Sequence, residues 1–213
     1  MEAINVHIDA VNALAVDTVN HYLYSGSADT TIKVFLKHKA SNKHALIACL
    51  EGPKSPVNAL ALSPDGSYLY SGHSDNSIVV WKRQDDEDLH DLKHMCPAGL
   101  LRGHRQAVLC LATIFNLVVG GSADKTVRVW KQNRNGLHTS LSVMVGHTGP
   151  VKSLCISTDM AMGVLVYSGS MDRDVRVWWI PEDEKDYISS DESSPDSPVL
   201  VKWRFSNISL PSL

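Results

Sequence analysis

Residues 103–130 read GHRQAVLCLATIFNLVVGGSADKTVRVW, and this stretch decides the fold. Within it, residues 107–112, 117–121 and 126–130 are short runs rich in β-branched and aliphatic side chains, and turn residues at 122–125 separate the last two. Such runs predict one small antiparallel sheet. Because apolar side chains occupy both of its faces, the sheet must pack between copies of itself.

The copies are located by their aspartates. Four aspartates each stand six residues before an aromatic residue that ends a strand-like run, and they are 46, 49 and 48 residues apart. This spacing is slightly above the ~40–45 residues of a propeller blade, and long loops account for the excess. The pairs are Asp29 with Phe35, Asp75 with Trp81, Asp124 with Trp130, and Asp172 with Trp178.

The repeats predict an all-β chain, a β-propeller with four blades of four-stranded antiparallel sheet. The domain is expected over residues 1–181, with blades at about 4–50, 51–102, 103–145 and 146–181. Residues 182–198 carry seven acids against one lysine, with serine and proline, and are expected to form a disordered acidic linker. Residues 199–213 are expected to hold an outer strand, VLVKWRF, and a tail.

The composition is that of a soluble globular protein of 213 residues, 44% hydrophobic and 20% charged. No run approaches the ~18 apolar residues of a membrane helix, and the N-terminus lacks the basic start of a signal peptide. Four cysteines occur singly, which favours the cytoplasm or the nucleus. A pI of ≈ 6.3 without a basic stripe disfavours direct nucleic-acid binding.

A set of polar and aromatic residues recurs in the third and fourth repeats. Hydroxyl, imidazole and carboxylate groups together suggest a catalytic triad, but the G-x-S-x-G motif is absent and catalytic sites do not recur in identical copies. A structural network is therefore predicted, with no catalytic residue and no cofactor. Its members are His104, Asp124 and Trp130 in the third repeat and His147, Asp172 and Trp178 in the fourth.

The first two repeats depart from this pattern. His7 precedes the first repeat, but Phe35 replaces its tryptophan and removes an indole donor. Pro53 stands where the other repeats carry histidine, so the second repeat is expected to lack that polar tie. The loop that follows has no second Cys/His pair at ligand spacing, so no metal site is expected at its candidate ligands, His90, His94 and Cys96.

The third and fourth repeats, with phrases such as GSADKTVRVW and GHTGPVKSL, resemble the WD-repeat β-propeller family. Within it, the chain is similar to plant proteins of the Jingubang type over roughly residues 4–180. That resemblance implies a non-enzymatic scaffold for protein–protein interactions in growth and signalling regulation. Such proteins resemble seven-repeat chains, so four repeats predict an incomplete, open arc of a seven-bladed ring. Residues 4–6 are then expected to be the outer strand of a missing blade, which suggests a truncated product or an incomplete gene model.

The alternative function is a substrate receptor of a ubiquitin ligase. In WD proteins, that role usually goes with an acidic residue after the repeat tryptophan and an arginine two positions further. Here Lys82, Lys131 and Trp179 follow the three tryptophans, so this feature is absent.

The partner surface is predicted at one rim of the propeller, where the turn at the histidine position and the turn at the aspartate emerge together. Arginine and methionine are enriched at interface cores. Solvated turn residues are the alternative interpretation. The predicted partner-binding residues are Lys54, Arg105, Gln106, Lys125, Met171 and Arg173.

Two further surfaces are predicted. An open arc exposes apolar faces on its end blades, and these favour self-association. The face of the first blade is expected to contain Val11, Leu14, Val34 and Phe35, and that of the fourth Val175, Val177 and Trp179. The acidic linker has serines in kinase-type contexts, Ser189, Ser193, Ser194 and Ser197, and is expected to compete for the basic rim.

Overall fold

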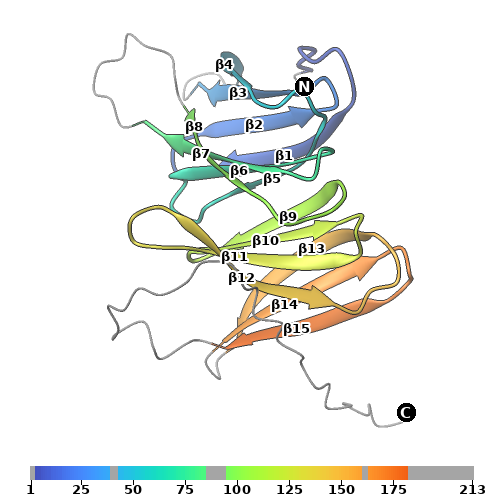
Figure 1. The fold of residues 1–213 in the computed structure, drawn as a ribbon. Helices are drawn as coiled ribbons and strands as arrows, with labels where there is room; N and C mark the ends of the chain where they lie inside the picture. The colour runs from blue at the N-terminus through green and yellow to red at the C-terminus, as the bar shows by residue number, and fades with distance from the viewer. Residues whose placement is uncertain (1–2, 39–42, 85–94, 160–162, 182–213) are drawn as a thin grey trace, which may run out of the picture.

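The computed structural model describes residues 3–38, 43–84, 95–159 and 163–181. These residues form fifteen β-strands in four antiparallel sheets, stacked one after another in chain order (Figure 1). In the described part of the chain, no helix is long and apolar enough to span a membrane. The all-β architecture predicted from the repeats is therefore confirmed.

Each sheet is a meander whose strands pair in sequence order. The first contains β1 (Val11–Asp17), β2 (Tyr22–Ser27), β3 (Thr31–Lys37) and β4 (His44–Glu51). The second contains β5 (Val57–Leu62), β6 (Tyr68–His73), β7 (Ile78–Arg83) and β8 (Met95–Leu101). The third contains β9 (Val108–Ile114), β10 (Leu117–Ser122), β11 (Thr126–Gln132) and β12 (His138–Val145), and the fourth β13 (Val151–Asp159), β14 (Gly163–Ser170) and β15 (Val175–Pro181).

The fourth sheet has three strands among the described residues, because the expected outer strand at 199–205 lies outside them, as does the linker at 182–198. Residues 4–6, expected to form an outer strand of another blade, are described and are not part of any strand. They precede the turn that carries His7, which lies against the first sheet.

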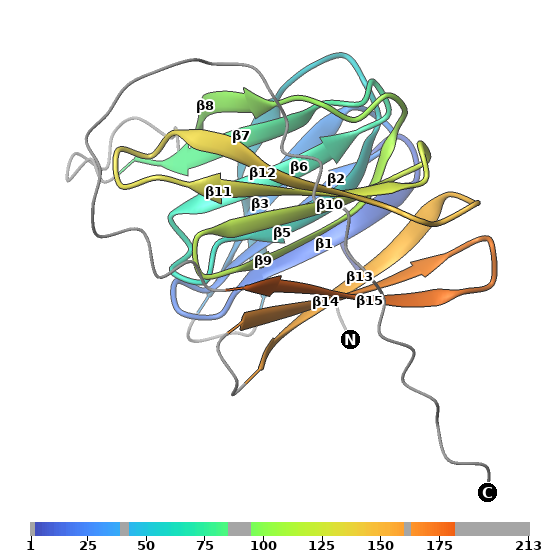
Figure 2. The same ribbon diagram turned by 60° about the horizontal axis from the view of Figure 1, so that its bottom comes forward.

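The sheets face one another through their innermost strands, since β1 contacts β5, β5 contacts β9 and β9 contacts β13 (Figure 2). Three apolar clusters fill the three junctions. Trp81 belongs to the cluster between the first and second sheets, Trp130 to the next, and Trp178 to the last. Full burial of one valine or leucine contributes about 1.5–3 kcal/mol, so these junctions hold the open arc together.

Polar ties reinforce the junctions. The side-chain amide of Asn12 donates to the Val57 carbonyl at 2.9 Å, and that of Asn58 donates to the Val108 carbonyl at 3.0 Å. Arg83 on β7 forms an ion pair with Asp17 on β1. Burial alone would raise the pKa of Asp17, but hydrogen bonds from Asn20 and Arg83 outweigh it and lower the pKa.

The expected open face of the first sheet is correct in part. Val11 is 51% exposed and Leu14 62%, whereas Val34 and Phe35 are buried. Val34 faces the second sheet and belongs to the first junction cluster. Phe35 lies on an interior strand, opposite Leu23 on one neighbour and Leu46 on the other, and these strands help to cover it.

Candidate interaction surface

The fourth repeat contains a complete chain of polar contacts. Trp178 Nε1–H donates to Ser168 Oγ at 2.8 Å, and Ser168 Oγ lies 2.8 Å from His147 Nε2. On the other side of the ring, Nδ1 of His147 lies 2.8 Å from Asp172 Oδ2. With a neutral imidazole that donates from Nδ1 to the carboxylate and accepts the serine hydroxyl proton at Nε2, every polar group in this chain of contacts has a hydrogen-bond partner.

The third repeat uses the same histidine–aspartate pair without the serine. His104 Nδ1 lies 3.0 Å from Asp124 Oδ2, and its Nε2 lies 3.2 Å from the carbonyl oxygen of Gly120, which occupies the serine position. Trp130 meets the His104 ring edge-on, with centroids 5.6 Å apart. The third-repeat tryptophan therefore contributes packing against the ring.

The second repeat lacks the tie between a turn histidine and the repeat aspartate, as Pro53 predicts, but it has a different polar tie that the sequence did not predict. Trp81 Nε1–H donates to Ser71 Oγ at 2.9 Å, which lies 2.8 Å from His73 Nε2. His73 Nδ1 is 3.2 Å from the carbonyl oxygen of Ser55. The imidazole comes from the end of β6 rather than from the turn, and burial lowers its pKa.

In the first repeat, His7 bridges Asp29 and Ser25. Its Nδ1 lies 2.7 Å from Asp29 Oδ2, and its Nε2 lies 2.7 Å from Ser25 Oγ.

The repeat aspartates Asp29, Asp124 and Asp172 share one electrostatic feature. Burial alone would raise their pKa values, but hydrogen bonds from side chains and backbone N–H groups outweigh it, so all three pKa values lie well below the usual range.

The aspartates fix the turns at one edge of the sheets. Asp124 Oδ2 accepts the backbone N–H of Arg105 at 2.8 Å, and Asp172 Oδ2 accepts that of Thr148 at 2.8 Å. The next residue is left-handed in both repeats, with φ of 72° at Lys125 and 76° at Arg173. The histidine turn and the aspartate turn therefore lie side by side.

The six residues predicted to bind a partner all lie on these turns and are all exposed to solvent. Two of them, Arg105 and Gln106, follow His104, and Lys125 follows Asp124. Met171 and Arg173 flank Asp172, and Lys54 lies in the corresponding turn of the second repeat. We call this set, Lys54, Arg105, Gln106, Lys125, Met171 and Arg173, the rim residues.

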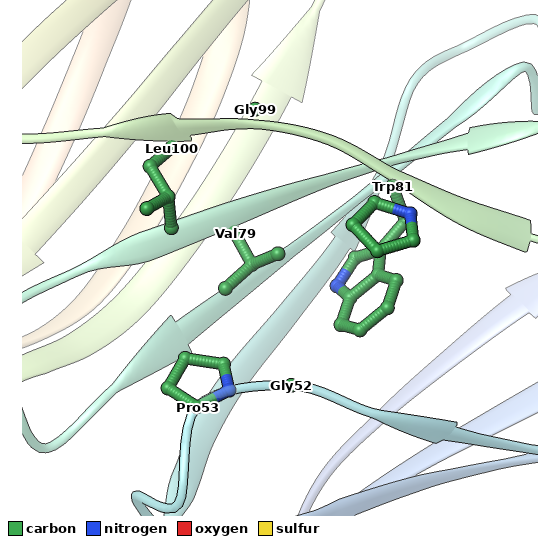
Figure 3. Close-up of a pocket in the computed structure, with 7 residues that line it drawn as sticks. Gly52, Pro53, Val79, Trp81, Gly99 and Leu100 are labelled. Atoms are coloured by element: carbon green, nitrogen blue, oxygen red, sulfur yellow. The ribbon is translucent and has the colours of Figure 1, made fainter.

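Sequence reasoning missed a hollow of ≈ 440 Å³ between the loop after β4 and strands β7 and β8. Figure 3 shows Pro53, Val79 and Leu100 around it. Arg128 and Arg176 occupy the position of Val79 in the third and fourth repeats, where they pack against Gly103 and Gly146. Aligning the repeats reveals the arginine-to-valine exchange that leaves this space open.

The described residues offer little acid–base chemistry outside the network. In the described ranges, no group of three or more His, Cys, Asp or Glu side chains is placed to hold a metal ion. Cys96 is described, whereas His90 and His94 lie outside those ranges. The hollow is lined by apolar side chains and glycines, so it suits an apolar group better than a reaction.

Curated relatives match short segments of the chain. Mitochondrial division protein 1 of Schizosaccharomyces pombe is 31% identical over 106 aligned residues, and the match covers 41% of this chain and 16% of that protein. The putative E3 ubiquitin-protein ligase LIN-1 of Lotus japonicus is 36% identical over 76 residues, 36% of this chain and 5% of that protein. The chain thus spans a small part of these relatives.

Among solved structures, the computationally designed Ika4 protein is similar, with a TM-score of 0.66 and 29% identity. The match covers 84% of this chain and 96% of the designed one. The family model "WD domain, G-beta repeat" matches residues 2–35, 44–82, 95–131 and 138–178, well over half of the chain. Because this model covers more than half of the chain, the chain belongs to the WD-repeat family.

Proposed function

We propose that this protein is a non-enzymatic scaffold that binds protein partners through the rim residues. The WD-repeat fold is typical of such scaffolds. The observation that carries the proposal is the attachment of the rim turns to buried carboxylates, as in the bond from Arg105 N–H to Asp124. A surface held by a rigid network loses little conformational entropy when a partner binds.

The charge of the rim suggests the chemistry of the partner. Lys54, Arg105, Lys125 and Arg173 place four cationic side chains on exposed turns. Met171, 67% exposed, adds an adaptable apolar contact. The complementary partner is a protein segment that presents acidic side chains or phosphate groups beside an apolar residue.

Affinity purification from native tissue with mass spectrometry tests the proposal. The double variant Arg105→Glu/Arg173→Glu is compared with wild type and with Arg134→Glu, an exposed arginine in the β11–β12 turn at the opposite end of the strands. We expect a defined group of proteins to be lost only from the double variant. An unchanged protein set would remove the rim as the binding surface.

We propose that this scaffold acts in plant growth or signalling regulation, in the cytoplasm or nucleus, and the resemblance of phrases such as GSADKTVRVW to Jingubang-type proteins supports this role. The acidic linker at 182–198 is proposed to compete for the rim, more strongly when its serines are phosphorylated. Deleting residues 183–198 should then raise affinity for an acidic partner at low salt and less so at high salt. Equal affinities at low salt would leave the linker without this role.

A role as substrate receptor of a ubiquitin ligase is the second candidate, favoured by the similarity to LIN-1. Against it stand Lys82 and Lys131 after two of the repeat tryptophans, where ligase receptors usually carry an acidic residue. The same purification separates the two functions. Ligase adaptor subunits recovered with the wild-type chain would support the receptor role, and their absence would favour the scaffold.

A further inference from the structure

The three junctions between sheets use one repeated contact. At each, the first valine of an innermost strand packs against the glycine at the same position of the preceding sheet's second strand. A Cβ atom on that glycine would lie 2.5–2.7 Å from the valine Cγ1. The pairs are Val57 on Gly26, Val108 on Gly72 and Val151 on Gly121, and all three valines are 0% exposed.

The third strands supply a second repeated contact. The apolar residues three and five positions after each repeat aspartate are at most 2% exposed in the first three sheets: Ile32, Val34, Ile78, Val80, Val127 and Val129. Ile32 and Val34 pack in one cluster with Val57 and Leu60 of the next sheet. At this junction, a valine and a leucine of the following sheet therefore pack against a glycine and two branched apolar residues of the preceding sheet.

Among the described residues, the end sheets present the two halves of this junction without a partner. On the first sheet, Val11 and Leu14 occupy the positions of Val57 and Leu60, but they are 51% and 62% exposed, whereas Leu60 is 9% exposed. Exposed apolar side chains at positions that form a junction elsewhere indicate that this face can pack against another sheet.

On the fourth sheet, Val175 and Val177 occupy the positions of Ile32 and Val34 and are 74% and 49% exposed. Gly169 occupies the glycine position, and a Cβ there would approach only Ser153 of its own sheet within 4 Å. Within the part of the chain that the structure describes, no valine covers Gly169 as one covers each of the other three glycines.

We propose that the two end faces bind each other between two copies of this chain, head to tail. The apolar face around Val11 and Leu14 of one copy covers Gly169, Val175 and Val177 of the other. The two faces are the complementary halves of one junction. Each chain carries one face of each kind. A second copy therefore supplies both missing halves at once.

Two copies that bind at both ends close a ring of eight sheets, within the 4–8 blades that propellers use. Because the joined faces differ, the contact is heterologous, and such contacts give closed rings when the rotation permits. Lys152 stands where Asn12 and Asn58 donate to a carbonyl of the following sheet. In the pair, its exposed ammonium is placed to donate to the Val11 carbonyl of the second copy. Arg105, Gln106 and Lys125 lie on the turns of the third sheet, away from the two end faces, so this contact leaves them available to a partner.

Two variants, each blocked at one end, test the proposal by light scattering on the purified 213-residue chain. Wild type is expected at twice the chain mass of 23.4 kDa. Leu14→Arg and Val177→Asp are each expected at the mass of a single chain. Leu14→Arg disrupts the first-sheet face, and Val177→Asp the fourth-sheet face, in both contacts between the two copies. An equimolar mixture should regain the double mass, because the intact fourth-sheet face of Leu14→Arg binds the intact first-sheet face of Val177→Asp.

The control is Leu137→Asp, which changes a side chain that is 64% exposed in the turn directly before β12 and should keep the double mass. Circular dichroism melting verifies that each variant is folded. A wild type that stays at the single mass at tens of micromolar would overturn the proposal. So would a Val177→Asp chain that pairs with itself, since like faces would then be in contact, or a mixture that stays at the single mass.

Discussion

Asp124 accepts the backbone N–H of Arg105 at 2.8 Å, across 19 residues of chain, while the same Oδ2 atom lies 3.0 Å from His104 Nδ1. Its other oxygen accepts the N–H and the hydroxyl of Thr126 at 2.9 and 2.6 Å. One carboxylate thus ties together the histidine turn, the aspartate turn and the start of β11. The buried network and the exposed rim are joined at this residue.

Replacing Asp124 by alanine should lower the free energy of unfolding by about 1–3 kcal/mol, because its buried donors lose their acceptor. Asp75→Ala is the matched control. Asp75 accepts hydrogen bonds from Ser77 alone, and the N–H of Asp75 is held by Ser55. The control should cost less than about 1 kcal/mol in urea unfolding. Equal losses for the two variants would contradict the assignment of Asp124 as the anchor.

Acid should destabilise the fold in two windows. Burial lowers the pKa of His73 below its unfolded value of about 6.5, so the unfolded chain binds more protons and stability declines as pH falls through that value. Asp29, Asp124 and Asp172 have pKa values below the unfolded value of about 3.9. Their stabilisation is full above that value and is lost as pH falls further.

Urea unfolding from pH 7 down to about pH 2 covers the upper window and the onset of the lower one. Asp124→Asn should flatten the lower window, because one depressed carboxyl group is removed, and His73→Gln should flatten the upper one. Stability that rises from pH 7 to pH 5 in the wild type would contradict the buried, neutral state of His73.

Thr30 is a β-branched residue with a φ of 73°, at the left-handed position that follows the first repeat aspartate. Left-handed backbone costs an ordinary residue about 1–2 kcal/mol, and asparagine tolerates it better. Asn76 holds the same position in the second repeat with a φ of 70°. Thr30→Asn should raise the unfolding free energy by roughly 1 kcal/mol, and Asn76→Thr should lower it by a similar amount. Changes of the same sign in both variants would refute this account of the turn.

Gly72 lies where a Cβ would be 2.7 Å from Val108 Cγ1, so Gly72→Ala should force the second and third sheets apart. Overpacking of this kind costs about 1–3 kcal/mol. Gly99 has nothing within 4 Å of its Cβ position, and Gly99→Ala is therefore the control. Thermal melting of the two variants compares them. A Gly72→Ala chain as stable as Gly99→Ala would show that the junction tolerates movement.

Much of the fold could be predicted from one offset, the six residues from each aspartate to an aromatic, because turn and strand chemistry repeat with it. The turn at 64–66 is predictable from its own residues, because proline fixes φ and glycine takes a positive φ, and Gly66 has a φ of 71°. The burial of Val34 was harder to predict, because a strand with two apolar faces does not reveal which face meets the neighbouring sheet.

The polar network was less predictable in the second repeat, where a residue from another position takes the role of the turn histidine. His73 comes from β6 and replaces the missing turn histidine, so its role depends on two strands meeting in space. The hollow beside Val79 depends on the absence of a long side chain from a junction. Aligning the repeats reveals the histidine at position 73 and the valine at position 79. The structure is needed to show that His73 restores a polar network and that Val79 leaves a space.

We infer that the residues that hold the fold are distinct from those that bind a partner. The most direct test measures partner affinity by calorimetry and melting temperature on the same preparations of Arg105→Glu/Arg173→Glu, with a partner recovered by affinity purification. Because both side chains are exposed, we expect the melting temperature to stay within about 2 °C of wild type, with at least a tenfold loss of affinity. Unchanged affinity, or a loss that merely follows a fall in melting temperature, would contradict the account.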